Sequence, residues 1–563
     1  MILEYSIVMR KHWWFDAGLA GLYSIASIED ERLNGFNIKM KIDNEKQALV
    51  FQYNSISELR SYFETCYEIL AERYWNVSTI KQKENPELVV YNKMKNELLL
   101  LPKRNPTPIV SLFIGARSWQ GEGIPYNEIK EPLKSRVDQF LNETKSKLWG
   151  SNKLLLFNQP VCHQKLTILP QTNNRKKYDI CSVCGQSSQY VNEIGLPSFL
   201  LFASSNATKS FNSQGKNPAK ICWECEFISK FAVESASYKK DKKSIFIIQI
   251  SSPDIEKLLE MQKEFGALSS LRLLDDKYYL SNIGHESNSL IKYCSAPYEL
   301  LWSFMEDKYN LLLKECSENE FDNALLDSFF SSFLEKFTNT PVQFYVLYAE
   351  DSGDTFLSKN LIVYNEVGYF YRLIHYLKKI GVNTRIFFHS LYEEDFSYRE
   401  KVIRNILKKN SILFLIEQIC FRKVMTEQFI SMKHILNFTI EYEQIIRGDE
   451  MNKEQIETAV NLGKQIVIQA VEIAGMGEEN EKQALKKIKG DLYQLRKTRN
   501  KTDFLNQINN LQFRYGVSVS NRLLEGTLEE VNFEDFRAYC ILGALNVYNA
   551  KNKDKEDKHN EER

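Results

Sequence analysis

The chain has 563 residues, of which 43% are hydrophobic and 12% aromatic, and its 73 basic residues are balanced by 73 acidic ones. This length exceeds what one hydrophobic core supports and predicts a folded protein of about two to four domains. Zero formal net charge excludes a global basic field, so any nucleic-acid contact must come from local patches.

The N-terminus and the cysteines predict a cytoplasmic protein without a membrane segment. Residues 1–6 lack the basic region and apolar core of a signal peptide. Apolar runs such as residues 411–420 are far shorter than the ~20 residues that span a bilayer. Cysteines outside the two paired motifs described below are scattered singly, which suits reduced thiols better than a disulfide framework.

The N-terminal part of the chain alternates between helical and strand patterns. The first 30 residues are expected to form a helical entry, because Trp13, Trp14, Ala17, Leu19, Leu22 and Ile25 cluster near one face. Alternating apolar residues at 36–42 and 49–53, with a turn at Asp43-Asn44, predict a β-hairpin. A helix is expected over 57–74. Further strands are predicted at 109–114, 244–251 and 342–348, and further helices at 253–264, 320–337 and 366–380.

A glycine-rich loop follows the strand predicted at 109–114. Its sequence is Gly115-Ala-Arg117-Ser-Trp119-Gln120-Gly121-Glu-Gly123. Glycines let a backbone approach DNA closely, Arg117 could donate a bidentate pair to guanine, and Gln120 could contact adenine. Trp119 could anchor the loop. The alternative is an ordinary surface turn.

Two Cys-x-x-Cys pairs form the strongest motif. Cys181-Ser-Val-Cys184 and Cys222-Trp-Glu-Cys225 are separated by 37 intervening residues. Each pair can present two thiolates from a tight turn, so together they predict a closed structural Cys₄ Zn²⁺ site within a module at about 160–235. Catalytic zinc would need an open ligand position. A redox role is the lesser alternative, because neither pair clearly lies where a strand feeds a helix. The polar stretch 204–220 is expected to be a flexible excursion.

Basic residues gather at two places. Residues 482–501 carry eight basic side chains against one acid, a local charge of +7, and a helical face there could track a phosphate backbone. The candidate contacts are Lys486, Lys489, Tyr493, Arg496, Lys497, Arg499 and Lys501. A second patch contains Lys239, Lys240, Lys242 and Lys243. The alternative for the first is a solvated helix face, and the alternative for the second is an ordinary surface loop.

The C-terminal part of the chain predicts only helices. From about residue 400 the strand patterns largely disappear, and apolar residues between 451 and 475 follow a helical stripe. We expect an α+β protein with a mixed α/β N-terminal body (1–445) carrying an inserted Cys₄ zinc module. An all-α helical bundle (446–550) and a disordered tail (551–563) would follow.

Common catalytic motifs are missing from the sequence. It contains no Gly-rich phosphate loop ending in Gly-Lys-Ser/Thr, no His-Glu-x-x-His and no Gly-x-Ser-x-Gly. A binding protein is therefore favoured over an enzyme. Two alternatives stay open: a zinc-containing nuclease with an unrecognised carboxylate site, and a zinc-stabilised scaffold without nucleic-acid contact.

Three features together resemble a known family. They are Trp13-Trp14-Phe15-Asp16-Ala17-Gly18 followed by Gly21-Leu22-Tyr23, the central Cys-x-x-Cys pairs, and the helical C-terminus. This combination resembles the CRISPR-associated CXXC-CXXC proteins, the large subunit of the type I-B RNA-guided surveillance complex, Cascade. The resemblance covers the architecture end to end but rests on some 20 residues.

The resemblance implies a non-catalytic subunit for antiviral defence. Such a subunit recognises the protospacer-adjacent motif, helps to open target double-stranded DNA and supports the R-loop formed with guide RNA. Other Cascade subunits and a recruited helicase-nuclease would be its partners. The C-terminal helices would resemble the small subunit that holds the displaced strand.

A separate hypothesis concerns Met451. Residues 447–450, Arg-Gly-Asp-Glu, can be encoded by purine-dense codons, which would place a ribosome-binding sequence just before an internal start. Residues 451–563 would then also be made as a free small subunit.

Overall fold

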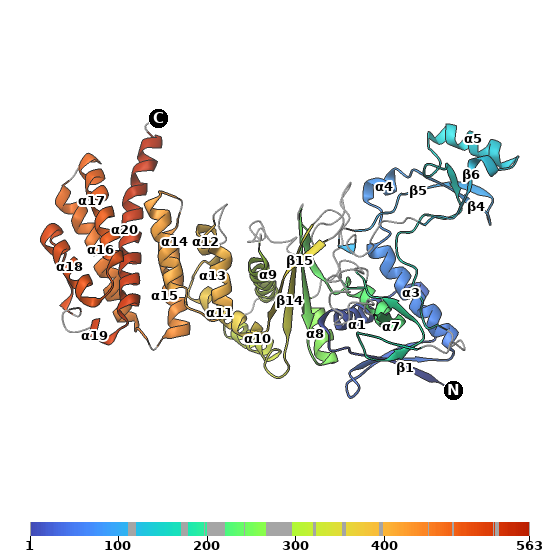
Figure 1. Ribbon diagram of the computed structural model, residues 1–563, viewed down its shortest axis with the longest axis horizontal. Coiled ribbons are helices and arrows are strands. Elements are labelled where there is room, and N and C mark those ends of the chain that lie inside the picture. Colours follow the sequence, from blue (N-terminus) through green and yellow to red (C-terminus); the bar gives the residue numbers. More distant parts are fainter. Residues whose placement is uncertain are drawn as a thin grey trace. The chain divides into compact units, whose positions relative to one another are not determined.

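A computed structural model shows that packing divides the chain into two compact units (Figure 1). The first contains Met1–Ser287 and Asn310–Val367, and the second contains Asn288–Tyr309 and Gly368–Arg563. The structure describes residues 2–107, 109–110, 120–170, 178–195, 198–199, 220–240, 243–265, 296–318, 323–351, 356–392, 398–428, 430–448, 450–475, 478–521, 523 and 528–561. Each unit is described by itself below.

The first unit begins with a three-stranded antiparallel sheet in the order β1-β3-β2. Its strands are β1 (Leu3–Val8), β2 (Lys39–Asp43) and β3 (Ala48–Tyr53). The predicted hairpin is confirmed, and β2 pairs with β3 through Met40↔Phe51 and Ile42↔Leu49. β1 was not predicted: the helix expected over the first 30 residues starts only at Trp13, and a strand precedes it.

The N-terminal part of this unit also contains four helices. They are α1 (Trp13–Ala26), α2 (Glu31–Asn34), α3 (Ile56–Tyr74) and α4 (Ile80–Glu84). The His12 side chain caps α1 by accepting a hydrogen bond from the Trp14 backbone N–H, and Ser55 caps α3 in the same way through Glu58. Both helices turn their apolar residues into one core beside the sheet. The helix predicted over 57–74 is confirmed.

A small lobe within the first unit has a core of its own. Its sheet has the order β5-β4-β7-β6 and carries one helix. The elements are β4 (Leu88–Asn92), β5 (Glu97–Leu101), β6 (Gly123–Pro125), α5 (Leu133–Thr144) and β7 (Leu154–Leu156). The buried residues are Val89, Ile129, Val137 and Leu155.

Five short elements carry or flank the cysteine pairs. These are β8 (Asp179–Ile180), β9 (Ser187–Ser188), β10 (Val191–Glu193), β11 (Lys220–Cys222) and α7 (Trp223–Phe231). β8 pairs with β9 and β10 with β11, both antiparallel.

A four-stranded antiparallel sheet in the order β12-β13-β14-β15 completes the first unit. Its elements are β12 (Ser237–Lys240), β13 (Ser244–Ser251), β14 (Gln343–Asp351) and β15 (Phe356–Tyr364), with α8 (Ile255–Phe265) and α10 (Asn323–Glu335). The strands predicted at 244–251 and 342–348 are confirmed. The helices predicted at 253–264 and 320–337 are confirmed as α8 and α10. β13 is buried almost throughout, which explains its uninterrupted apolar run Ile245–Ile248.

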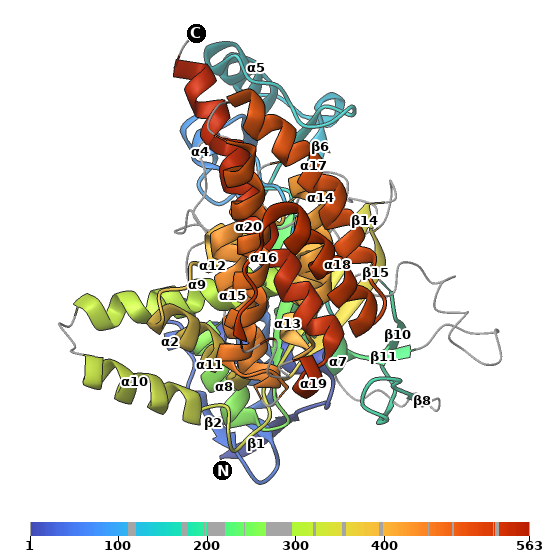
Figure 2. The same ribbon diagram turned by 90° about the vertical axis from the view of Figure 1, so that its left-hand side faces the viewer.

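The second unit is helical. Its elements are the start of α9 (Pro297–Glu318), most of α11 (Val367–Lys379), α12 (Thr384–Ser390), α13 (Tyr398–Leu407), α14 (Leu413–Met425), α15 (Met432–Arg447), α16 (Lys453–Ala474), α17 (Glu478–Lys497), α18 (Lys501–Tyr515), α19 (Leu528–Glu530) and α20 (Phe533–Glu561). α16 and α20 lie side by side (Figures 1 and 2). Among the described helices, none is both long and apolar enough to cross a bilayer.

The predicted fold class is confirmed at the coarse level, since a mixed α+β part precedes a helical C-terminal part. The packing boundary differs from the predicted one at residue 445. α11–α15 pack with the C-terminal helices, so the second unit resumes at Gly368. α20 also continues to Glu561, through residues for which composition predicted disorder. Lys and Glu favour a helix even where no apolar side chain is available for packing.

Candidate metal centre and nucleic-acid interface

The four cysteines converge on one point. The Sγ atoms of Cys181, Cys184, Cys222 and Cys225 all lie within 4.8 Å of one another. Cys181 and Cys184 occupy a tight turn after β8, in which the Gly185 N–H donates to the Cys181 carbonyl at 2.9 Å. Gly185 adopts a positive φ of 71° that this turn requires. The predicted ligand set is therefore brought together as one cluster that can hold a metal ion.

The second pair lies at the junction of β11 and α7. Cys222 is the N-cap residue of α7, and Cys225 belongs to its first turn. The Ser182 N–H donates to the Lys220 carbonyl at 2.8 Å and joins the two cysteine turns. This geometry corrects one step of the sequence argument, because this pair does lie where a strand feeds a helix, a position that favours thiolates.

The spacing of the thiols fits a tetrahedral metal. A metal–sulfur distance of about 2.3 Å in a tetrahedron separates neighbouring sulfurs by about 3.8 Å. The Cys184 and Cys222 Sγ atoms are 3.8 Å apart. Four sulfurs around one ion complete its coordination, so the cluster has the chemistry of a structural site.

Ionisation of the cluster is strongly coupled. Hydrogen bonding to Cys184 lowers the pKa of Cys181, whereas hydrogen bonding to Cys181 raises the pKa of Cys225. One thiolate thus makes the next one harder to form. A bound cation would relieve this opposition, since it attracts every thiolate at once.

The N-terminal motif packs directly on the second cysteine turn. An added Cβ at Gly18 would overlap the Ile228 carbonyl oxygen, and one at Gly21 would overlap that of Phe231. These glycines therefore let α1 approach the backbone of α7, whose N-cap is Cys222. The Trp13–Tyr23 motif and the cysteine pair are parts of one packed site.

Polar contacts strengthen this packing. Arg10 forms an ion pair with Glu224 in the first turn of α7, and the Tyr5 hydroxyl donates to the same carboxylate. The buried Asp16 carboxylate accepts the backbone N–H groups of Arg10 at 2.6 Å and His12 at 2.8 Å. Burial raises the pKa of Asp16 to about 6, although these N–H groups and the Arg10 charge oppose the shift.

The glycine-rich loop is described only in part. Arg117 and Trp119 lie outside the described residues, as do positions 111–114 of the predicted strand, and Ile109 and Val110, its first two positions, are not in a strand. Gln120 is exposed, and its backbone pairs with Val161 in an isolated antiparallel bridge. Motif reading by this loop stays a prediction.

The basic patch before β13 is partly a strand. Lys239 and Lys240 belong to β12, are half-buried and face Phe246 and Ile245 across the sheet. Lys243 is exposed, and Lys242 lies outside the described residues. The alternative of an ordinary surface loop is therefore wrong for the first two lysines.

Two cations of the C-terminal basic run are held by α14. The Lys489 Nζ donates to the Met425 carbonyl at 2.8 Å, and the Arg496 Nε donates to Glu417 at 2.7 Å. Lys501 forms an ion pair with Glu529. Exposed cations without a hydrogen bond or ion pair to the described residues are Lys486, Lys487, Lys497 and Arg499. Some cations of the predicted face therefore hold helices together, and the others are exposed to solvent.

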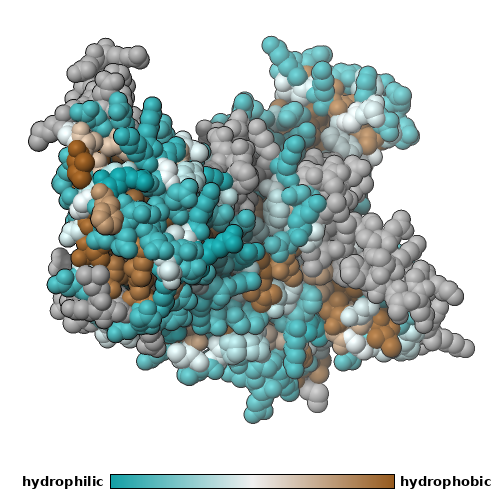
Figure 3. All heavy atoms as spheres, turned by 60° about the vertical axis from the view of Figure 1, so that its left-hand side comes forward, coloured by the Kyte–Doolittle hydropathy of each residue, from teal (hydrophilic) through white to brown (hydrophobic). Residues whose placement is uncertain are grey.

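Sequence reasoning missed the residues that surround this run in space. Phe414 and Glu417 of α14 and Arg537 of α20 line a pocket with Tyr493 and Arg496. Their distance along the chain hid them, because helical periodicity relates only residues on one helix. Figure 3 shows apolar side chains breaking the hydrophilic surface of the second unit. Its exposed large apolar residues include Phe414, Ile473, Tyr493, Leu505 and Phe513.

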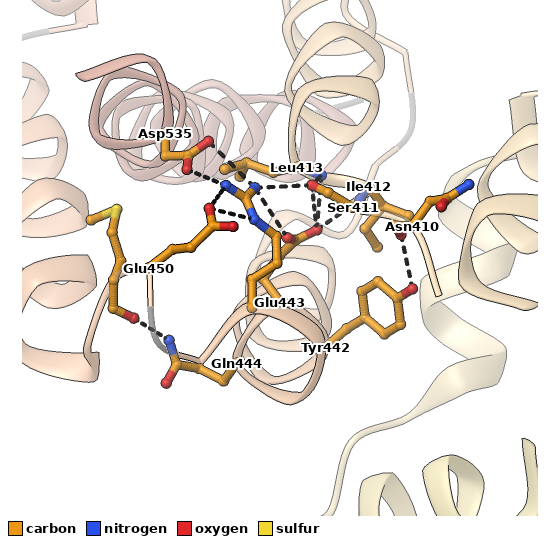
Figure 4. Close-up of polar contacts among 11 residues, drawn as sticks. Asn410, Ser411, Ile412, Leu413, Tyr442, Glu443, Gln444, Glu450 and Asp535 are labelled. Carbon is orange, nitrogen blue, oxygen red and sulfur yellow. Dashed lines mark hydrogen bonds and ion pairs between the residues drawn. The ribbon is translucent and has the colours of Figure 1, made fainter. Parts of the chain in front are cut away.

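A buried polar cluster joins three helices of the second unit (Figure 4). Arg447, the last residue of α15, forms ion pairs with Glu450 and, at 2.5 Å, with Asp535 of α20. Glu443 accepts hydrogen bonds from the backbone N–H groups of Ile412 and Leu413 at the start of α14. This cluster spans the predicted boundary at 445 and lies beside Met451, which is buried.

No protein-family model matches the chain, and no curated protein matches it at a significant level.

Proposed function

We propose that this chain is the non-catalytic large subunit of a type I-B CRISPR surveillance complex, in which it recognises the protospacer-adjacent motif and supports DNA unwinding. The observation that carries the proposal is the packing of α1 on α7. Residues on which the resemblance rests, Gly18 and Gly21 in one motif and Cys222 in the other, meet through these two helices. Two motifs far apart in sequence thus serve one structural purpose.

The metal in this proposal is Zn²⁺. Zinc prefers four thiolates in tetrahedral geometry and has no redox chemistry of its own, which suits a site that fixes a fold. The four cysteines would hold it and join the two turns to α7. The chemistry of DNA cleavage would belong to a recruited helicase-nuclease.

The second unit would contact nucleic acid through its exposed cations. Lys486, Lys487, Lys497 and Arg499 lie on or just after α17, and each phosphate that they neutralise would release a counterion. Guide RNA pairing would supply most of the sequence specificity, so the protein needs only a short motif-reading surface. Arg117 and Gln120 stay the candidates for that surface.

The deciding experiment assembles the complex with and without this chain. The other subunits and guide RNA are co-purified, mixed with a target duplex that carries or lacks the motif, and probed with permanganate, which modifies unpaired thymines. We expect strand opening only with the chain present and the motif intact. Opening without the chain, or equal opening of both duplexes, would contradict the proposal. Metal-dependent cleavage of labelled DNA by the isolated chain would instead favour a nuclease.

The proposal includes a separate small subunit made from residues 451–563. Such a fragment keeps α16–α20 but lacks Arg447 and all of α14. Asp535 would lose its ion pair, and the surface of α20 that packs on α14 and α15 would need another cover. We therefore expect the fragment to be stable as part of the complex, where other subunits can cover this surface.

A further inference from the structure

A pocket of about 310 Å³ lies between α14, α17 and α20 in the second unit. Its volume is at the lower end of the range for small-ligand sites, about 300–1,000 Å³. The lining residues are Phe414, Glu417, Tyr493, Arg496, Lys497, Arg537 and Ala538. The size suits one small planar group and excludes a folded partner.

The pocket presents aromatic side chains that are partly uncovered. Phe414 is 42% exposed and Tyr493 is 40% exposed. The Tyr493 ring stands edge-on to the buried ring of Phe421, with centroids 4.8 Å apart. The Arg496 guanidinium lies over the same Phe421 ring at 4.7 Å. Because Tyr493 and Arg496 both pack on the buried Phe421 ring, ligand binding would cost these two side chains little conformational freedom.

The charge of the lining is positive. The lining contains three cations, Arg496, Lys497 and Arg537, and one carboxylate, Glu417. Arg496 uses Nε and Nη2 on that carboxylate, and Arg537 uses Nη1 on the Thr498 carbonyl. Within the described part of the chain, Arg496 Nη1 and Lys497 Nζ have no hydrogen-bond partner. Donors for an anion are therefore available beside the aromatic faces.

We propose that this pocket binds one unstacked nucleotide of a single nucleic-acid strand, with its base against Tyr493 and Phe414 and its phosphate at Arg496, Lys497 and Arg537. Aromatic side chains that stack bases, combined with cations along the backbone, are the usual means of holding single strands. A base paired within a duplex is already stacked and cannot enter. Recognition would not depend on sequence, because every base has a π face.

This inference rests on the proposed function, since it assumes that the chain works on opened nucleic acid, and it adds a defined site. Phe414 and Glu417 precede Met451, so a fragment of residues 451–563 would lack one wall of the pocket. The site would thus distinguish the full chain from any small subunit with the same C-terminal helices.

The test uses the full-length chain and fluorescein-labelled oligothymidylate, with fluorescence anisotropy measured between about 50 and 200 mM salt. Tyr493→Ala should weaken binding about tenfold because one stacked base is lost, with the salt dependence unchanged. Tyr493→Phe keeps the ring and should bind like the wild type. Lys497→Gln should lower the salt slope by about one.

An oligomer of the same length made of abasic sites separates stacking from charge. On this probe Tyr493→Ala and the wild type should bind equally. Lys486→Gln, outside the pocket, should weaken binding to both probes by the same factor. Phe414→Ala serves as an independent variant, and thermal unfolding of each variant checks folding. A parallel oligouridylate series identifies whether the strand is DNA or RNA.

The pocket proposal is overturned if Tyr493→Ala and Phe414→Ala, both folded, bind oligothymidylate as tightly as the wild type. That result would leave motif-dependent strand opening by the complex untouched. Conversely, loss of affinity in both variants, together with a complex that opens no motif-bearing duplex, would keep the pocket and reject the proposed function.

Discussion

Gly18 of α1 lies against the carbonyl oxygen of Ile228 in α7, so close that a methyl group in place of its hydrogen would overlap that oxygen. Gly21 has the same relationship with Phe231, one helical turn further along. Because Cys222 is the N-cap residue of α7, these contacts fix the N-terminal motif to the cysteine cluster. The position of the cysteine cluster depends on them.

Gly18→Ala should destabilise the first unit by about 1–3 kcal/mol, because the overlapping atom belongs to the backbone and cannot rotate away. The free energy of unfolding is measured by urea titration with tryptophan fluorescence. Gly490→Ala in α17 is the matched control, since an added Cβ there meets no atom within 4 Å. The control should be neutral or slightly stabilising, because alanine favours a helix over glycine. Equal stability of the two variants would disprove the close approach of α1 to α7.

Cys184→Ser should release the bound metal and destabilise the first unit. Removing one of four thiolates leaves a weaker site, and metal binding contributes directly to folding of such modules. Metal content is measured by mass spectrometry of the purified protein. Cys420→Ala, in the core of α14, is the control: it should lower stability by a cavity effect while metal content stays the same. Retention of a full equivalent of metal by Cys184→Ser would exclude the four-cysteine site.

Asp16→Asn should remove a pH dependence of stability. The pKa of Asp16 is about 6 in the folded protein because of burial, above its ordinary value of 3.8. Between these values the folded state binds more protons than the unfolded state, so the free energy of unfolding falls as pH rises from about 4 to about 6. The loss amounts to about 3 kcal/mol at most. Asparagine does not titrate.

The measurement compares urea unfolding of the wild type and Asp16→Asn at pH values from 4 to 7. The stability of the variant relative to the wild type should increase across this interval. Other buried acids, such as Glu400 with a pKa raised to about 7 by burial, titrate in both proteins and cancel. A stability difference that stays constant with pH would show that Asp16 titrates normally.

Local patterns predicted much of the fold because they act over a few residues. The hairpin at β2–β3, the buried strand β13 and the helix α3 follow from alternation, an apolar run and helical periodicity respectively. β1 was missed because Leu3 and Val8, at its two ends, and the preceding Ile2 are apolar but exposed, which blurs the alternation of apolar and polar residues.

The candidate site likewise has features that the sequence predicted and features that it did not. Cys-x-x-Cys spacing predicted all four converging residues, since metal ligation imposes its own local pattern. The charge run in α17 did not reveal that α14 holds Lys489 and Arg496, because Met425 and Glu417 are more than 60 residues away in sequence. Pairing between helices depends on their packing, which charge spacing does not encode.

Charge reversal therefore separates two groups of cations in α17. Arg496→Glu should destabilise the second unit, because it places two carboxylates together where Glu417 is already partly buried. Lys486→Glu and Lys487→Glu should leave the unfolding temperature unchanged and weaken binding to single-stranded DNA, with a lower salt slope. Thermal unfolding and anisotropy titrations check both. Unchanged affinity in the lysine variants would remove them from the interface.

Arg447 and Asp535 offer a test of the internal start at Met451. In the full chain, Asp535→Asn removes half of an ion pair and leaves Arg447 with Glu443 and Glu450. It should therefore lower the stability of the second unit. In a fragment of residues 451–563 Arg447 is absent, so a subunit that covers α20 in the complex would bury Asp535 without its ion-pair partner. There the same substitution should be stabilising.

Both proteins are expressed and unfolded by urea, the fragment within the complex if it requires a cover. Opposite signs of the stability change are expected. Met451→Leu in the full-length gene should abolish any short C-terminal product while sparing the full chain, because leucine keeps the apolar volume at this buried position. If the wild-type gene yields no fragment in purified complexes, residues 451–563 exist only as part of the full chain. Asp535 then always has Arg447 as its ion-pair partner, and its carboxylate is never buried without that partner.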